Sequence, residues 1–135
     1  MNAPDDAVTT LRRMFDCFVK GDIPALMSFV GEDSSWFFPG PPGLLPWAGE
    51  YRGPAGLMTA FQSISAHVEY VSYVPHTFFG QGDLVTVLTR EECRVKATGK
   101  TFVNELAVVA QVKDGKIARF RQYGDTQAIL AAFQP

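Results

Sequence analysis

The stretch Thr98-Gly-Lys-Thr-Phe-Val-Asn-Glu-Leu-Ala-Val-Val-Ala-Gln-Val-Lys-Asp-Gly-Lys-Ile-Ala-Arg-Phe-Arg-Gln-Tyr-Gly-Asp-Thr126 predicts the centre of the fold. It contains two runs rich in β-branched and aromatic residues, joined by the turn-forming pair Asp114-Gly115. Such a pair between two strand-like runs is a strong hairpin signal. We therefore expect a long β-hairpin, followed by a short helix with Asp125 or Thr126 as its N-cap.

Two registers of this hairpin are possible, and they differ in which side chains point inward. A two-residue loop pairs Lys113 with Lys116, whereas a three-residue loop with Gly115 as a bulge pairs Val112 with Lys116. A shift of one residue inverts every side chain, so we prefer the three-residue loop, which gathers more apolar residues on one face. That inner face would carry Phe102, Asn104, Leu106, Val108, Ala110, Val112, Ala118, Phe120 and Gln122. The outer face would carry Val103, Glu105, Ala107, Val109, Gln111, Ile117, Arg119, Arg121 and Tyr123.

The rest of the chain predicts helices that cover this sheet. Apolar residues at helical spacing indicate a helix over residues 5–20, a short helix capped by Asp22, a third helix beginning at Pro54, and a last one over residues 127–133. Strands are expected at residues 35–38, 67–79 and 84–96. The proline- and glycine-rich segment 39–53 predicts an irregular loop that either forms a lid or pocket rim, or packs on the core or a partner subunit. Segregated helices and strands indicate a single α+β domain over residues 1–135 with an antiparallel sheet.

Composition narrows the partners and cofactors. The net charge is −2 without a basic run, which argues against nucleic acid or an anionic membrane surface as a partner. No apolar stretch is long enough for a membrane span, and the N-terminus does not resemble a signal peptide, so a cytoplasmic location is expected. Cys17, Cys93, His67 and His76 lack the spacing of metal ligands. Without a glycine-rich phosphate loop either, we expect no metal and no cofactor.

Aromatic residues are numerous, with 11 Phe, 4 Tyr and 2 Trp among 135 residues. Core packing accounts for most of them, and some are expected to line a pocket for a small hydrophobic molecule. The buried amides Asn104 and Gln122 either bind that ligand or satisfy nearby backbone groups. The candidate lining consists of Asn104, Gln122, Phe15, Phe18, Trp36, Phe38, Trp47, Phe61, Phe78 and Leu106.

Motifs at residues 18–26, 36–40, 47–53 and 114–125, in this order, resemble the NTF2-like superfamily. The similarity is greatest to its branch of SnoaL-like polyketide cyclases and ketosteroid-isomerase-related proteins, and it covers nearly the whole chain. It implies a cone in which a curved antiparallel sheet wraps around the N-terminal helices and encloses an apolar pocket. It also implies a homodimer through the outer sheet face, which suits the apolar residues expected there.

The resemblance also directs attention to acidic residues. Ketosteroid isomerases carry an Asp base where this chain has Phe38. Relatives of limonene epoxide hydrolase use an Arg-x-Asp pair and a second Asp, for which this chain offers Arg90 with Glu92, and then Gln122. Arg90 and Glu92 share a strand face and form the best candidate catalytic pair, provided that they point inward. The opposite face of that strand is the more apolar one, so an inward pair requires a bulge or a polar pocket, and a solvated strand segment is the alternative.

SnoaL-type cyclases use a single Asp as acid and base in a hydrophobic pocket, where burial raises its pKa. Glu92 and Asp125 are the candidates here, although Asp125 is also explained as a helix cap. The resemblance therefore implies an enzyme of cyclase, isomerase or epoxide-hydrolase type, acting by acid/base chemistry on an apolar cyclic or polyketide-like molecule. A non-catalytic binding protein with the same pocket is the alternative, because the isomerase base and the second hydrolase acid are not matched. A protein-interaction domain that uses the outer sheet face is a third.

Overall fold

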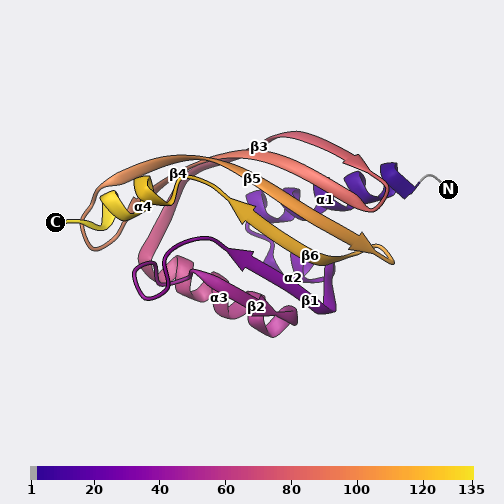
Figure 1. Cartoon of the computed structure of the whole chain (residues 1–135), viewed down its shortest axis with the longest axis horizontal. Helices are drawn as coiled ribbons and strands as arrows, with labels where there is room; N and C mark the ends of the chain where they lie inside the picture. The colour runs from indigo at the N-terminus through magenta and orange to yellow at the C-terminus, as the bar shows by residue number, and fades with distance from the viewer. Residues whose placement is uncertain (1–2) are drawn as a thin grey trace.

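A six-stranded curved sheet with helices on its concave side forms the molecule (Figure 1). The computed structural model describes residues 3–135, and the side chains of residues 7–135. None of the helices within residues 3–135 is both long and apolar enough to cross a membrane. The elements in chain order are α1 (Ala3–Lys20), α2 (Ile23–Met27), β1 (Val30–Phe38), β2 (Gly49–Arg52), α3 (Gly53–His67), β3 (Val68–Gln81), β4 (Leu84–Val95), β5 (Thr101–Lys113), β6 (Lys116–Tyr123) and α4 (Thr126–Phe133).

The strand order is β2-β1-β6-β5-β4-β3, and the sheet does not close into a barrel. All neighbouring pairs are antiparallel except β1 and β6, which run parallel, so the expected antiparallel sheet has one exception. Helix α1 packs against β3 and β4, and α3 packs against β1. The α+β class and the cone-like curvature are confirmed.

Two helix caps form as the sequence predicts. The carboxylate of Asp22 accepts a hydrogen bond from the backbone N–H of Ala25, at the start of α2. The carboxylate of Asp125 does the same for the N–H of Ala128, at the start of α4. Each bond satisfies a backbone donor that the first helical turn would otherwise leave unpaired.

The hairpin between β5 and β6 closes differently from the prediction. Asp114 and Gly115 form a two-residue loop, with φ angles of 53° and 74°. Lys113 consequently pairs with Lys116. Positive φ at both central residues is typical of the type I′ turn, which matches the natural twist of a hairpin. The predicted three-residue loop is therefore wrong.

A bulge in β6 explains how the apolar residues still reach the core. Val112 pairs with Ile117, but Ala110 pairs with Phe120, which leaves Ala118 as an extra residue on β6. The bulge lets both Ile117 and Phe120 point inward, and both are buried. The prediction that Ile117 faces outward is wrong, whereas the inward residues expected on β5 are all buried.

The segment 39–53 contains more regular structure than its prolines and glycines suggested. Residues 49–52 form β2, which pairs with β1 and places Tyr51 opposite Trp36. In the preceding turns Leu45 and Trp47 are buried, whereas Leu44 is exposed. The segment thus packs on the core, and Trp47 also lines the internal cavity.

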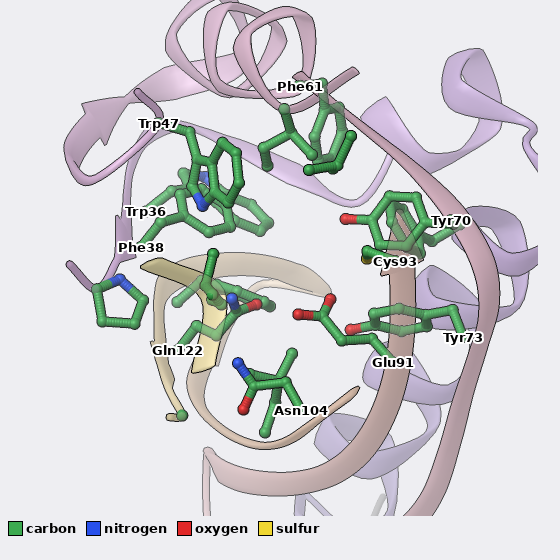
Figure 2. A pocket seen from close by; sticks show the side chains of 18 of the residues that line it. Trp36, Phe38, Trp47, Phe61, Tyr70, Tyr73, Glu91, Cys93, Asn104 and Gln122 are labelled. Carbon is green, nitrogen blue, oxygen red and sulfur yellow. The ribbon is translucent and has the colours of Figure 1, made fainter. Parts of the chain in front are cut away.

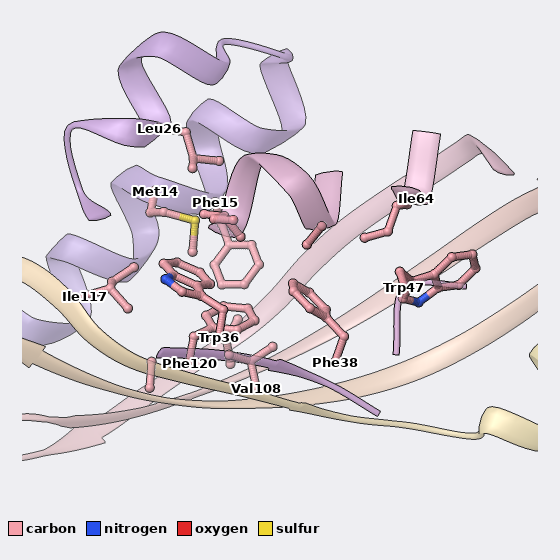
Figure 3. Packing of buried hydrophobic residues seen from close by; sticks show 14 of the residues in the cluster. Met14, Phe15, Leu26, Trp36, Phe38, Trp47, Ile64, Val108, Ile117 and Phe120 are labelled. Atoms are coloured by element: carbon pink, nitrogen blue, oxygen red, sulfur yellow. The ribbon is translucent and has the colours of Figure 1, made fainter. Parts of the chain in front are cut away.

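The core lies between the concave face of the sheet and the helices above it (Figure 3). Met14, Phe15 and Leu26 descend from α1 and α2. Trp36 of β1 meets them from below and stacks on Phe120 of β6, with ring centroids 4.6 Å apart. This packing holds the strands that border the cavity in position.

Candidate functional site

An internal cavity opens beside this core, enclosed by the sheet, α1, α3, α4 and the turns after β1. Its volume is about 50 Å³, which is room for a few water molecules. Most of its lining is aromatic or aliphatic. The lining residues are Met14, Phe15, Phe18, Leu26, Trp36, Phe38, Pro39, Trp47, Leu57, Phe61, Ile64, Val68, Tyr70, Tyr73, Glu91, Cys93, Phe102, Asn104, Leu106, Phe120, Gln122, Gly124, Thr126 and Ile129.

Glu91 is the carboxylate that points into this cavity (Figure 2). It is only 6% exposed, and within residues 7–135 no other acidic side chain and no Lys, Arg or His lines the cavity. Burial without a compensating cation disfavours the charged form. It raises the pKa of Glu91 from 4.5 to about 7. At neutral pH the carboxyl group is therefore poised between its acidic and basic forms.

Strand register places Glu91 in a polar row across three strands. Tyr73 of β3 pairs with Glu91 of β4, and Glu91 pairs with Asn104 of β5. Figure 2 shows the Tyr73 hydroxyl beside the Glu91 carboxylate, and the Gln122 amide on the opposite side of the cavity. This arrangement gives a ligand hydrogen-bonding groups on two sides and aromatic rings above them.

The two tyrosine hydroxyls remain protonated. Burial raises the pKa of Tyr73, and the hydroxyl of Thr89 near it offsets part of that rise. Oγ1 of Thr89 is itself buried and makes no well-formed hydrogen bond. Tyr70 is partly exposed, but its hydroxyl points into the cavity, and burial followed by the charge of Glu91 raises its pKa well above the usual value. Both phenols can therefore serve as hydrogen-bond donors.

Cys93 lies two residues after Glu91 on the same buried face of β4. Burial, followed by the charges of Glu91 and Glu92, raises the pKa of the Cys93 thiol. The thiol is therefore protonated at neutral pH, and a protonated thiol is a poor nucleophile. We therefore treat Cys93 as part of the apolar lining.

Asn104 and Gln122 both line the cavity, but they differ in what holds them. Oδ1 of Asn104 accepts the backbone N–H of Asp125 at 2.9 Å, and Nδ2 of Asn104 donates to the carbonyl of Asp125 at 3.2 Å. Asn104 thus ties β5 to the start of α4, which is the local backbone role. For Gln122 the structure records no side-chain hydrogen bond within residues 7–135, so its amide is available to a ligand.

The structure does not place the three candidate catalytic residues in the cavity. Arg90 and Glu92 lie on the outer face of β4, where Arg90 contacts Glu105 at 3.7 Å and Glu92 pairs with exposed Val103. No bulge interrupts the pairing of β4 with β5, so strand alternation keeps both side chains outward. The carboxylate of Asp125 is exposed and caps α4. The condition on which Arg90 and Glu92 were catalytic candidates is therefore not met, and the alternative of a solvated strand segment is the one observed.

Nine of the ten predicted binding residues line the cavity, namely Asn104, Gln122, Phe15, Phe18, Trp36, Phe38, Trp47, Phe61 and Leu106. Phe78 is the exception. Its ring lies against Phe15, with centroids 6.1 Å apart, and beneath the guanidinium of Arg12 at 4.4 Å. The inward side of β3 near its end thus faces α1 and not the cavity.

Sequence reasoning missed Glu91, although a signal for it was present. The odd-numbered residues of β4 alternate as Val85, Val87, Thr89, Glu91, Cys93 and Val95, and all are buried. A single acid within an otherwise apolar strand face is an anomaly that indicates a functional group. The Arg-x-acid motif of the related hydrolases instead indicated Arg90 and Glu92, which lie on the opposite face of β4.

Comparison with known proteins establishes the family. The SnoaL-like domain model matches residues 11–120. The chain belongs to the SnoaL-like family. An NTF2-like protein from Burkholderia xenovorans LB400 is 32% identical to this SnoaL-like chain, covering 97% of it and 98% of the other chain, with a TM-score of 0.85. This confirms the NTF2-like superfamily.

Two more distant proteins are similar to this SnoaL-like chain over nearly its full length. YesE of Bacillus subtilis (strain 168) is 24% identical over 98% of the chain and 90% of its own length. An LEH-like epoxide hydrolase of M. tuberculosis is 16% identical over 97% of this chain and 91% of that chain, with a TM-score of 0.71. At that identity the epoxide hydrolase shows the shared fold alone.

Proposed function

We propose that this SnoaL-like protein is an enzyme that acts on a small, largely apolar, carbonyl-bearing molecule, with Glu91 as its acid and base. The observation that carries the proposal is a single buried carboxyl group whose pKa is raised to about 7 in an aromatic cavity. General acid/base catalysis is most efficient when the pKa of the catalytic group is near the working pH. A structural role does not require an acid at this position, because an uncharged side chain would be cheaper to bury.

One carboxylate favours a proton-transfer reaction of the isomerase or cyclase type. Glu91 would take a proton from a carbon next to the substrate's carbonyl group. The C–H electron pair would form a carbon–carbon double bond, and the π pair of the carbonyl group would move onto its oxygen. The hydroxyl of Tyr73 and the amide of Gln122 would donate hydrogen bonds to that oxygen. Glu91 would then return the proton to a different carbon, so that substrate and product contain the same atoms. Water attack on an epoxide fits less well, since no second acid lines the described cavity.

Ligand identification followed by a matched pair of variants tests this proposal. Native mass spectrometry of protein purified from its host would identify the class of a retained ligand, which then serves as the substrate in assays. Glu91→Gln is expected to abolish most turnover while the ligand affinity is retained. The control is Glu92→Gln, the neighbouring acid on the outer sheet face, which is expected to leave turnover unchanged. Unchanged turnover in Glu91→Gln would remove Glu91 from the mechanism, whereas a wild-type protein that binds the ligand without turning it over would favour a binding protein.

We further propose that two copies associate through the outer sheet face. Val103 and Val109 of β5 and Tyr123 of β6 are exposed there, and an apolar surface of this kind favours burial against a partner. Sedimentation velocity at micromolar concentration is expected to give twice the 14.8 kDa chain mass. Val109→Asp should shift this to a monomer, whereas Leu44→Asp, exposed in the turn before β2, should not. A wild-type monomer would contradict the proposal.

A further inference from the structure

A second hollow lies on the other side of the aromatic wall of the cavity. This groove runs between the end of α1, α3 and the beginning of β3, and its volume is about 520 Å³. No charged side chain lines it within residues 7–135, and three exposed apolar residues, Val19, Tyr70 and Val71, border it. Its lining comprises Phe18, Val19, Gly21, Ile23, Met58, Phe61, Gln62, Ile64, Ser65, Tyr70, Val71, Ser72 and Tyr73.

The wall between groove and cavity is one side chain thick. Five side chains line both spaces, so each has one side on the cavity and the other on the groove. They are Phe18, Phe61, Ile64, Tyr70 and Tyr73. Phe18 lies at the centre of this wall, with its ring centroid 5.9 Å from Phe61, 5.6 Å from Tyr70 and 4.9 Å from Tyr73. Rotation of the half-buried rings of Phe18 and Phe61 would join the two spaces without displacing the backbone.

The size of the inner cavity makes this wall important. About 50 Å³ is less than a six-membered ring requires, so a cyclic ligand must push lining side chains aside. The lining residues Trp36, Phe38 and Phe120 are buried and packed against other core residues, so a ligand could not displace them without loss of packing. The wall at Phe18 and Phe61 has the open groove behind it. A ligand that enlarges the cavity at this wall therefore reaches into the groove.

We propose that the groove binds the apolar tail of the same ligand whose polar ring lies against Glu91. The ligand class is an uncharged, oxygen-bearing ring that carries an alkyl or isoprenoid chain. This inference rests on the proposed function for the position of the ring, and it adds the tail and its site. Because no charged side chain lines the groove within residues 7–135, we expect an uncharged tail, and the wall that the groove shares with the cavity favours one elongated ligand over a separate partner.

A series of 4-alkylphenols tests the proposal, from 4-methylphenol to 4-octylphenol, with Kd measured by calorimetry on the full chain. In the wild-type protein, affinity is expected to rise about fourfold for each methylene that becomes buried. Val71→Asp places a charge in the groove at a residue that is 58% exposed. It should abolish the rise with chain length and change the affinity for 4-methylphenol by less than about twofold, since the ring site lies behind the wall.

Two further variants make the outcome decisive. Val19→Asp charges the opposite wall from α1 at a 52% exposed residue and should flatten the series in the same way. Val74→Asp is the control, because Val74 lies on the same strand as Val71, is 50% exposed and does not line the groove. The proposal is overturned if wild type fails to bind the series, if affinity stops rising at short chains, or if Val71→Asp and Val19→Asp keep the wild-type slope.

The chain-length series is independent of catalysis. Glu91→Gln is expected to retain the slope, because the tail does not contact Glu91. A retained slope with unaffected turnover would refute Glu91 as the acid/base but leave the groove assignment intact. A flat wild-type series with turnover lost in Glu91→Gln would refute the groove assignment alone.

Discussion

Glu91→Gln is expected to stabilise the protein by about 3 kcal/mol at pH 8 while lowering turnover by about 10²- to 10⁴-fold. The stability gain follows from the pKa of Glu91, which burial raises from 4.5 to about 7. Between these two values the folded state keeps a proton that the unfolded state releases, so the free energy of unfolding falls as pH rises. Above about pH 7 the loss is complete. Glutamine remains uncharged and escapes it.

The measurement is urea unfolding of both proteins at pH 4 and pH 8. The two free energies of unfolding should be similar at pH 4, where Glu91 is protonated in both states, and should separate as pH rises through the window from 4.5 to 7. Glu92→Gln is the matched control, and its effect should stay within about 0.5 kcal/mol at both pH values. Parallel pH profiles for wild type and Glu91→Gln would contradict the burial of an ionisable Glu91.

Gain of stability with loss of activity is the signature that separates a functional acid from a structural one. An acid retained for packing or ion pairing would lower stability when replaced, because its partners would be left unsatisfied. Glu91 has no cationic partner in the described cavity. Its burial therefore costs free energy that an uncharged residue would not, which supports the proposal that function depends on this group.

Trp36→Ala is expected to lower the free energy of unfolding by about 3–5 kcal/mol. The indole is 2% exposed and stacks on Phe120. Its Nε1 donates a hydrogen bond to Oγ of Ser34 at 2.8 Å, and the truncation would leave this buried hydroxyl without its donor. Since a domain of this size is stabilised by only about 5–15 kcal/mol, the variant should be close to unfolding at room temperature.

Urea unfolding with an unchanged m-value provides the measurement. Trp36→Phe keeps a ring on Phe120, so its loss in the free energy of unfolding should be less than half that of Trp36→Ala. This variant gives a measurable free energy if the alanine variant does not fold. Leu44→Ala, in the exposed turn before β2, should change stability by less than about 0.5 kcal/mol. A loss below about 1 kcal/mol for Trp36→Ala would contradict the tight packing of β1 on β6.

The predictions that succeeded depend on residues that are close together in the sequence. Asp22 and Asp125 cap the helices that follow them, and such caps involve groups only three residues apart. Alternation along β5 correctly separated its buried and exposed residues, because period-two geometry is a property of any strand. The family motifs then correctly indicated the NTF2-like cone.

The predictions that failed depended on pairing between distant residues. We chose the hairpin register that placed the most apolar residues on one face, assuming regular alternation along β6. That choice was wrong because a bulge at Ala118 allows both Ile117 and Phe120 to point inward. β2 forms only because β1 offers it a partner, and its own residues carry little strand signal. Phe78 lies under α1 because β3 extends past the cavity.

The amino-acid sequence by itself determined the helices, five of the six strands, the inner face of β5 and the family, since these follow from local geometry and ordered motifs. Which acid enters the cavity was decided only by the tertiary structure. Arg90, Glu91 and Glu92 are consecutive, so a shift of one residue in the alternation of β4 would turn Glu91 outward and the other two side chains toward the cavity. The phase of this alternation is set by the pairing of β4 with β3 and β5, which places Glu91 between Tyr73 and Asn104. Its raised pKa then follows from the side chains that the fold assembles around it.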